Sequence, residues 1–492
     1  MLKTRHILDG SPYQGYTYAY PHKTAYRSLE PAPSLEDVWA QEAKEQLFLY
    51  VHIPFCEMRC GFCNLFTTVN SGEDVVRSYL KALEREAWGV ARALGPAKFS
   101  RLALGGGTPT YLHPDELFAL FATLEKIFGI RCDAIPISVE TSPATASKER
   151  MDVLDHYAVD RVSIGVQSFV ESEVRALGRA QDSRQLHKAL ETIRDSAVPH
   201  RNIDLIYGIP EQSPDTWLRS LREALAYEPE EIYLYPLYVR PLTGLGKKEF
   251  DWDDQRLNLY RIGRDFLLSE GYQQISMRMF QKPIAEPIAP RTNTKDSPPF
   301  VTSTATKHEV RSEVEMSRRG DNRASYETSR TIGSSIESSA KEQPIYCCQD
   351  DGMVGLGCGA RSYTKSLHYS HEYAVARSSI QNILAEYRTR PEQEFALAKH
   401  GFRLSLDEQR RRFLLQSLLQ KEGLDLKHYA ERFGTRAMTD YPELEDLPQR
   451  GLAALDAHRL RLTAKGLEYS DAIGPWLYSA SVQSLIAGYE LR

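Results

Sequence analysis

The sequence predicts an α/β protein whose main domain is an open, partial barrel of six strand–helix units. Short runs rich in β-branched and aromatic residues alternate with longer segments in which apolar residues recur every three or four positions, from residue 47 to residue 236. This alternation indicates parallel strands joined by helical crossovers. Six units are too few for a complete eight-stranded barrel. We therefore expect a partial (β/α)6 barrel, with a doubly wound sheet as the alternative.

The elements of this main domain follow one another in a regular order. Six runs are predicted as strands: Leu47–Ile53, Ser100–Leu104, Ile135–Val139, Arg161–Gly165, Asn202–Ile206 and Glu231–Pro236. The segments between them have the apolar spacing of amphipathic helices: Asp74–Leu94, Pro114–Phe128, Ala146–His156, Arg184–Asp195 and Pro214–Tyr227. The core barrel is expected to span residues 47–281.

Other regions flank or interrupt this core. Residues 1–46 hold an aromatic stretch from Tyr16 to Lys23, which we interpret either as part of a surface arm or as a lid over a flat aromatic substrate. Residues 282–344 contain no Leu and no Trp and are crowded with Ser, Thr and Pro, a composition that predicts a disordered insertion. Residues 345–399, with the glycine-rich piece Gly352–Ser362, are expected to end the core, and residues 400–492 to form a mainly helical, winged-helix-like domain.

Composition excludes several classes of protein. The chain has 492 residues, 42% apolar and 26% charged, as expected for a globular protein of several domains. Its net charge of -5 gives no support for nucleic-acid binding. No apolar run reaches the about 20 residues of a membrane helix, and the first fifteen residues lack the apolar core of a secretion signal. We expect a cytoplasmic protein with no membrane span and no nucleic-acid partner.

Three of the seven cysteines form the strongest local motif. Cys56, Cys60 and Cys63 have CxxxCxxC spacing and directly follow the first predicted strand. Thiolates gathered in one short loop suit a soft metal or an iron–sulfur cluster. A structural zinc site would require a fourth ligand nearby, and His52 lies inside the strand. Three protein ligands leave one iron of a cubane cluster open to a substrate or cofactor.

Polar residues and glycines recur where the predicted strands end. Gly105–Thr108 follow the second strand, Glu140 the third and Gln167 the fourth, while Asp204 lies on the fifth strand with Tyr207 at its end. Ligands of parallel α/β proteins bind at this edge of the sheet. Each residue also has a structural interpretation, since Glu140 could cap a helix and Asp204 could pair with an arginine. Together they favour a binding site.

The order of these motifs resembles that of a known family. The loop HIPFCEMRCGFC is similar to the cluster-binding loop of radical S-adenosylmethionine (SAM) enzymes. GGGTPT, SVE, SIGVQSF, LGR and DLIYGIP then follow as in oxygen-independent coproporphyrinogen III oxidase and its HemN and HemW relatives, which include a heme chaperone. The resemblance runs from about Leu47 to Ser276, resumes at Asp350–Ser362 and continues weakly to the C-terminus. It implies a radical SAM barrel with a HemN-type C-terminal domain.

The resemblance also implies roles for individual residues. The three cysteines would each hold one iron of a 4Fe-4S cluster, and SAM would chelate the fourth iron. Residues of the strand ends would contact the methionine, amino, carboxylate and ribose groups of SAM: Gly106, Thr108, Glu140, Gln167, Arg179 and Asp204. Tyr50 and Phe62 would pack near the adenine or the cluster, and a second SAM molecule would bring in Ile206. No residue is assigned to catalysis itself.

The implied activity is that of a radical SAM oxidoreductase. Reductive cleavage of SAM would give methionine and a 5'-deoxyadenosyl radical that removes hydrogen from a porphyrin-like or other large substrate. The required partner is an electron donor such as a flavodoxin or ferredoxin. The alternative is a heme-binding chaperone that keeps the cluster and the SAM site without the oxidase reaction.

Two departures from the family separate this chain from both kinds of relative. The oxidase has a further cysteine two residues after the third, where this chain has Leu65. The chaperone carries a His-Asn-x-x-Tyr-Trp motif before its late glycine-rich segment, whereas this chain has no His-Asn pair. Cys347 and Cys348 are interpreted as a heme ligand, a redox pair or residues without a function.

Overall fold

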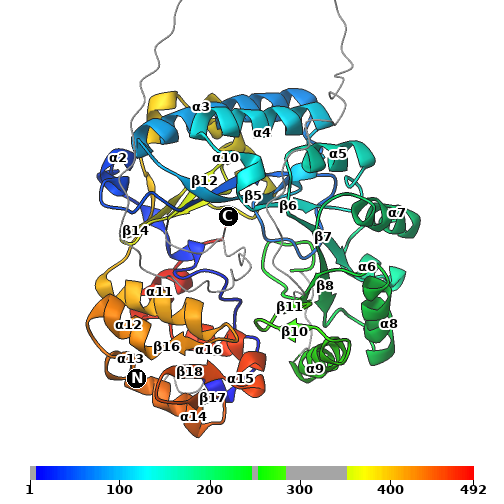
Figure 1. The fold of residues 1–492 in the computed structure, drawn as a ribbon, viewed down its shortest axis with the longest axis vertical. Helices are drawn as coiled ribbons and strands as arrows, with labels where there is room; N and C mark the ends of the chain where they lie inside the picture. The colour runs from blue at the N-terminus through cyan, green and yellow to red at the C-terminus, as the bar shows by residue number, and fades with distance from the viewer. Residues whose placement is uncertain (1–6, 247–252, 284–351, 492) are drawn as a thin grey trace, which may run out of the picture.

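A computed structural model describes residues 7–246, 253–283 and 352–491 of the chain. Its central element is a mixed sheet of thirteen strands. Figure 1 shows this sheet curved within a layer of helices, with the C-terminal domain beside its open side. The architecture confirms the expected α/β class and the open, partial barrel.

The six predicted strands are present as neighbours in one parallel array. Their register runs without interruption from β2 to β9 except for shifts in β2 and in β7. Strand β2 is almost wholly apolar and buried, whereas β7 and β8 also carry polar residues that line a cavity, such as Ser163 and Asp204. The bounds of the six strands are β2 (Leu47–Ile53), β5 (Phe99–Gly106), β6 (Ile137–Thr141), β7 (Arg161–Gln167), β8 (His200–Tyr207) and β9 (Glu231–Pro236).

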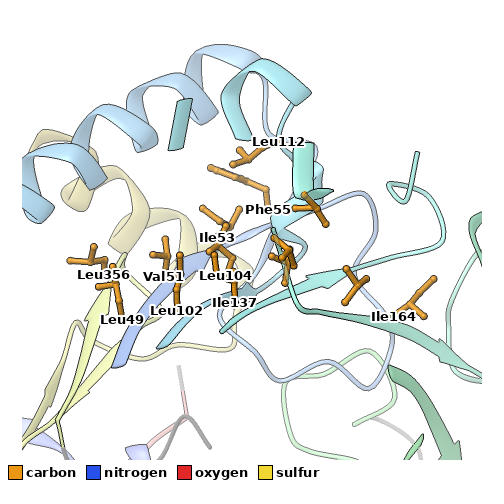
Figure 2. Close-up of a cluster of buried hydrophobic side chains, with 14 of the residues drawn as sticks. Leu49, Val51, Ile53, Phe55, Leu102, Leu104, Leu112, Ile137, Ile164 and Leu356 are labelled. Carbon is orange, nitrogen blue, oxygen red and sulfur yellow. The ribbon is translucent and has the colours of Figure 1, made fainter. Parts of the chain in front are cut away.

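A seventh parallel strand, β12 (Met353–Leu356), pairs with β2 and was missed in the sequence. It is only four residues long and contains Gly355, so it has neither the length nor the β-branched content of a typical strand. Its Leu356 lies opposite Val51. Figure 2 shows Leu356 beside Leu49 and Val51 in the hydrophobic core under the helices.

The helices cover the outer face of the barrel, and several begin and end as their sequences predict. In α4, Pro114 occupies the first turn, and Gly129 ends the helix in the left-handed conformation. Its Leu117 and Phe121 are fully buried in the core. The covering helices are α3 (Glu73–Leu94), α4 (Pro114–Phe128), α5 (Lys148–His156), α6 (Glu171–Ala176), α7 (Ser183–Arg194), α8 (Pro214–Leu225), α9 (Asp253–Ser269) and α10 (Arg377–Thr389).

Antiparallel strands extend the sheet at both ends. Beyond β12 lie β13 (Arg361–Tyr363), β14 (Leu367–Ser370), β15 (His400–Arg403) and β1 (Arg27–Ser28). Beyond β9 lie β11 (Met279–Gln281) and β10 (Gln273–Gln274). These additions turn the partial barrel into a mixed sheet.

The C-terminal domain has its own hydrophobic core, formed around Leu414, Leu418 and Tyr429. Its helices surround a three-stranded antiparallel sheet, as a winged-helix-like domain requires. The helices are α11 (Leu406–Leu418), α12 (Leu426–Phe433), α13 (Ala437–Asp440), α14 (Asp446–Gln449), α15 (Ala464–Glu468), α16 (Ser470–Trp476) and α17 (Ala480–Ala487), and the strands are β16 (Leu424–Asp425), β17 (Ala453–Leu455) and β18 (Arg459–Leu462).

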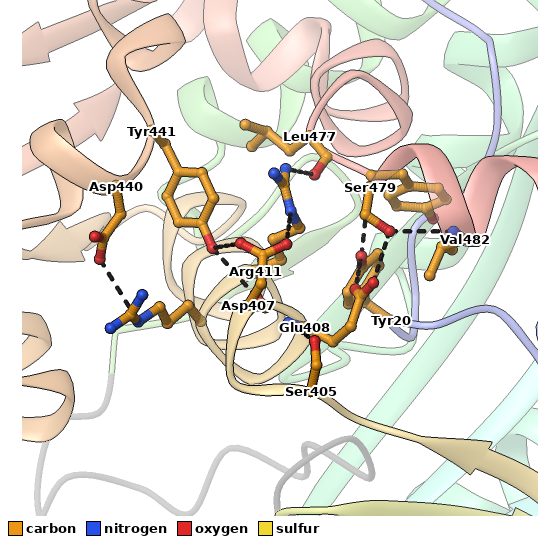
Figure 3. A network of polar contacts seen from close by, with 12 residues as sticks. Tyr20, Ser405, Asp407, Glu408, Arg411, Asp440, Tyr441, Leu477, Ser479 and Val482 are labelled. Atoms are coloured by element: carbon orange, nitrogen blue, oxygen red, sulfur yellow. Dashed lines mark hydrogen bonds and ion pairs between the residues drawn. The ribbon is translucent and has the colours of Figure 1, made fainter.

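The N-terminal arm is more than a surface segment. The arm contains the short helix α2 (Leu35–Trp39), and its strand β1 joins the sheet. Its buried residues include Tyr13, Tyr20 and Tyr26. Figure 3 shows Tyr20 donating a hydrogen bond to Glu408 of α11. The same carboxylate accepts from Ser479 Oγ at 2.7 Å, so the arm is fastened to both ends of the C-terminal domain.

Some predictions fall outside the described residues. These include nearly all of the predicted insertion, from residue 284 onward, and also Cys347 and Cys348. Among the residues described, no helix has the length and apolar character needed to cross a bilayer.

Candidate radical SAM site

The three cysteines lie on one loop between β2 and α3, which we call the cluster loop (residues 54–67). Two short parallel strands, β3 (Phe55–Cys56) and β4 (Thr68–Val69), hold its two ends together. Each cysteine is half-buried, and all three line a single cavity of about 980 Å³. The cavity lies at the carboxyl ends of the parallel strands, where the sequence predicts a site.

Each cysteine sulfur lies near a polar side chain. Thr108 Oγ1 donates to Cys56 Sγ at 3.6 Å, and Arg179 Nη1 lies 3.2 Å from Cys60 Sγ. Thr67 Oγ1 lies 3.9 Å from Cys63 Sγ. Burial raises the pKa of Cys56 to about 12, although the Thr108 hydrogen bond opposes this shift. Without iron this thiol is protonated, and metal binding must displace its proton.

The donor set fits an iron–sulfur cluster better than a single metal ion. Among the described residues, no three His, Cys, Asp or Glu side chains are arranged to bind one ion. A cubane cluster places each cysteine ligand on a different iron, so its three thiolates need not converge on one point. Cys56, Cys60 and Cys63 lie on one short loop and line the same cavity.

His52 is not available as a fourth ligand, as its position in the strand predicts. Its Nε2 lies 2.9 Å from the carbonyl oxygen of Phe66, which can only accept, so Nε2 carries the proton. Burial lowers the pKa of His52 to about 4. The neutral ring therefore ties β2 to the far end of the cluster loop.

Close contacts with the cluster loop and with the His52 ring explain two glycines of the GGGTPT motif. Gly106 has φ +114, and a Cβ there would lie 2.5 Å from the His52 ring. A Cβ at Gly107 would lie 2.7 Å from the carbonyl oxygen of Phe55. Only glycine permits this close approach between the end of β5 and the cluster loop. The motif thus fixes the position of the loop that carries the cysteines.

Glu140 lies at the end of β6 and faces the cavity. Its carboxylate accepts a hydrogen bond from the Gly106 N–H at 2.9 Å, so it supports the glycine loop and caps no helix. Its side chain is exposed to the solvent that reaches the cavity. Desolvation by the protein around the cavity raises the pKa of the carboxyl group to about 7, although the Gly106 N–H opposes the shift.

Two further predicted residues lie on the same side of the cavity. Asp204 accepts hydrogen bonds from Asn202 at 2.7 Å and from Ser163 at 3.4 Å, and burial raises its pKa to about 6. Gln167 has φ +71 and sits at a register shift in β7, with its amide folded over Gly165. Backbone strain at a non-glycine residue is common in binding sites.

Arg179 connects this side of the cavity with the cluster loop. Its guanidinium donates to the Gly165 carbonyl at 2.7 Å and to Gln181 Oε1 at 2.8 Å, besides its contact with Cys60. Such a rigid, fixed cation suits a carboxylate ligand.

Of the other predicted site residues, some line the cavity and one lies in the hydrophobic core. Tyr50, Phe62 and Ile206 line the cavity. Tyr207 does not belong to the site, contrary to the expectation from its position at a strand end. Its ring is fully buried against Tyr13, because the arm covers that part of the sheet.

Sequence reasoning found only part of the remaining cavity lining. The aromatic stretch of the arm, expected as a surface arm or a lid, lines the cavity through Tyr16, Tyr18 and Lys23. Arg240 after β9, Arg361 of β13 and Tyr373 after β14 also line the cavity and were missed. The other residues are brought there by the antiparallel extension of the sheet and by the chain that follows β9.

Known proteins share both the sequence motifs and the fold. The family model of the Radical SAM superfamily matches residues 50–224, and that of the HemN C-terminal domain matches residues 404–469. The oxygen-independent coproporphyrinogen III oxidase of Salmonella typhimurium is 34% identical over 284 residues, which cover 55% of this chain and 61% of that protein. The protein of the same name from Escherichia coli K12 is 26% identical over 471 residues, which cover 92% of this chain and 91% of that protein.

A chaperone is also among the relatives. Heme chaperone HemW of Escherichia coli K12 is 30% identical over 243 residues, which cover 48% of this chain and 63% of the chaperone. The solved structure of coproporphyrinogen III oxidase (HemN) from Escherichia coli, described as a radical SAM enzyme, superposes with a TM-score of 0.67 at 24% identity. The superposition covers 90% of this chain and 92% of that one.

The family-model match over residues 50–224 and the cysteine loop identify a radical SAM domain in this chain. In the first relatives, the match spans about 60% of their own length. The chain also carries a HemN C-terminal domain, and it is similar to oxygen-independent coproporphyrinogen III oxidases and to the heme chaperone HemW.

Proposed function

We propose that this protein is a radical SAM enzyme that acts on a porphyrin-like substrate, with an oxidase of the coproporphyrinogen III type as the nearest reaction. The observation that carries the proposal is the single cavity that holds the three cysteines, the strand-end residues and a broad aromatic surface. An electron donor such as a flavodoxin or ferredoxin would be required.

The residues present fit the two cofactors. Cys56, Cys60 and Cys63 would hold the cluster, and Glu140 and Arg179 offer opposite charges for the amino and carboxylate groups of SAM. When bound, the cofactors would supply one-electron cleavage of a carbon–sulfur bond and removal of hydrogen from the substrate. The chain itself fixes the cluster loop through His52 and Gly106 and encloses the site beneath the arm.

The size and lining of the cavity support a large, flat substrate. Its volume of about 980 Å³ lies at the upper end of the range of about 300–1,000 Å³ for small-molecule sites, which leaves room for a substrate beside SAM. Flat rings stack well on aromatic side chains. The tyrosines that line the cavity are Tyr16, Tyr18, Tyr50, Tyr235, Tyr238, Tyr373, Tyr478 and Tyr489.

An anaerobic assay tests the proposal. The chain is reconstituted with iron and sulfide, reduced with dithionite and given SAM, and 5'-deoxyadenosine is quantified by mass spectrometry. Cleavage is expected in the unchanged chain, and faster cleavage with coproporphyrinogen III. Cys63→Ala should abolish it, while Cys132→Ala, a buried cysteine away from the cavity, should retain it. Equal cleavage by Cys63→Ala and the unchanged chain would refute the assignment.

A heme-binding chaperone is the second candidate. It is favoured by the similarity to HemW and by Leu65, which stands where the oxidase has its further cysteine. Heme titration separates the two candidates: tight binding in a fixed ratio, with no substrate-dependent SAM cleavage, would favour the chaperone.

A further inference from the structure

The arm side of the cavity carries a group of cations that none of the predicted roles uses. We call Lys23, Arg240 and Arg361, which all line the cavity, the cationic wall. They come from three segments that are far apart in the sequence: the arm, the chain after β9, and β13. Their convergence is therefore a product of the tertiary structure, not of a local charge run.

Two of these cations lie against tyrosine side chains. Arg361 Nη1 lies 3.2 Å from the Tyr18 oxygen, and the guanidinium carbon lies 4.9 Å from the centre of the Tyr18 ring. Lys23 Nζ lies 3.6 Å above the ring centre of Tyr373. Although burial alone would raise the pKa of Tyr18, Arg361 and Lys23 lower it. The local field therefore favours negative charge.

The same cations also lower the pKa of His22. Burial lowers its pKa well below the usual range, and Lys23, Arg361 and Arg240 lower it further. Its Nδ1 accepts a hydrogen bond from the Thr24 N–H at 3.3 Å, which is consistent with a neutral ring. The charged groups with the largest effect on the pKa of this ring are thus cationic. Cations crowded in this way are stabilised by an anionic ligand.

The cationic wall adjoins the cluster loop. Tyr373, which lies under Lys23, donates a hydrogen bond to the Asn64 carbonyl oxygen at 2.6 Å, next to Cys63. The same cavity is also lined by the carboxylates of Glu57, Glu140, Asp204 and Glu372 and by the guanidinium of Arg179. Because Arg179 is assigned to SAM, Lys23, Arg240 and Arg361 are the cations of the cavity that the proposed cofactor contacts leave unused.

We propose that Lys23 and Arg361, with Arg240 beside them, bind a carboxylate group of the substrate and orient it toward the cluster loop. This inference rests on the proposed function and deepens it, because it makes substrate carboxylates a requirement for recognition. A carboxylate between an ammonium and a guanidinium forms charge-assisted hydrogen bonds, which are stronger than neutral ones. Tyr18 and Tyr373 hold the two cations in place.

A binding experiment with two matched porphyrins tests this assignment. Coproporphyrin III, with four propionates, is compared with its neutral tetra(hydroxyethyl)amide, which has the same ring and similar side-chain length, by fluorescence titration of the full chain. Lys23→Met and Arg361→Gln should each weaken coproporphyrin III binding about tenfold (about 1.4 kcal/mol). Binding of the amide should change less than about twofold. Lys23→Arg should restore most of the loss.

Matched controls are Lys148→Met and Arg77→Gln, two exposed residues on α5 and α3, which should leave both affinities unchanged. If Lys23→Met and Arg361→Gln weaken the binding of both porphyrins equally, or weaken the binding of neither, a carboxylate site is refuted. A second measurement is the calorimetric titration of the cluster-reconstituted variants with SAM, in which we expect an unchanged SAM affinity. A tenfold loss of SAM affinity would assign the wall to a SAM carboxylate and overturn the substrate site. Failure of the unchanged chain to bind either porphyrin would overturn the proposed function itself, and this inference with it.

Discussion

Glu140 provides the sharpest test of the SAM site, because its pKa of about 7 makes its charge change near neutral pH. The perturbation is Glu140→Gln, which keeps an acceptor for the Gly106 N–H but removes the carboxylate charge. If the ionised carboxylate binds the cationic amino group of SAM, SAM affinity falls as the pH drops below about 7. The variant should bind SAM more weakly and lose this dependence on pH.

The magnitude follows from the ionised fraction of Glu140. With a pKa of about 7, about one tenth of the groups are ionised at about pH 6 and about one half at about pH 7. SAM affinity should therefore fall at most about fivefold over this interval, or about 1 kcal/mol. This is an upper value, because water in the cavity screens the charge. Higher pH is avoided, since an α-amino group itself loses its proton near pH 8.

Calorimetric titration of the reconstituted chain with SAM measures the effect at the two pH values. Glu149→Gln, a change of an exposed glutamate on α5, is the matched control and should behave as the unchanged chain. Equal SAM affinities of the unchanged chain at both pH values would refute the reasoning. A variant that keeps the full pH dependence would assign it to another group, such as Asp204.

The remaining predictions concern the scaffold of the site. Gly106→Ala should lower the free energy of unfolding, measured in urea, by about 1–3 kcal/mol. The reason is that the new Cβ would contact the His52 ring at a residue with positive φ. Unchanged stability would mean that the loop shifts freely. Glu231→Ala should cost about 3–5 kcal/mol, because it leaves the buried Arg161 without its ion partner at 2.8 Å. Arg77→Ala, which breaks only exposed pairs, should cost less than about 0.5 kcal/mol in the same assay, and a similar loss in all three would contradict the burial argument.

Much of the barrel was predictable because its elements are set by local patterns. The apolar run Leu47–Ile53 and the helix Pro114–Phe128 have in the structure the bounds read from the sequence. The cysteine spacing and the glycines after β5 were equally local signals. They indicated the site because the carboxyl ends of parallel strands meet at one edge of a sheet.

Other features could not be predicted, since they depend on which distant segments become neighbours. The strand β12 is recognisable only through its pairing with β2, and Tyr207 leaves the site only because the arm covers it. The pKa of Glu140 reflects desolvation by the protein around the cavity, which a sequence does not specify.

The sequence by itself thus determined the repeat of strands and helices, the cysteine loop and the strand-end residues, because each is encoded by spacing within a few residues. The tertiary structure alone decided the far side of the cavity. Lys23, Arg240 and Arg361 are separated by more than a hundred residues in each case, and they converge through the register of the sheet and the path of the arm. Their combined positive electrostatic potential, which favours carboxylates, exists only when the fold brings all three side chains to one cavity.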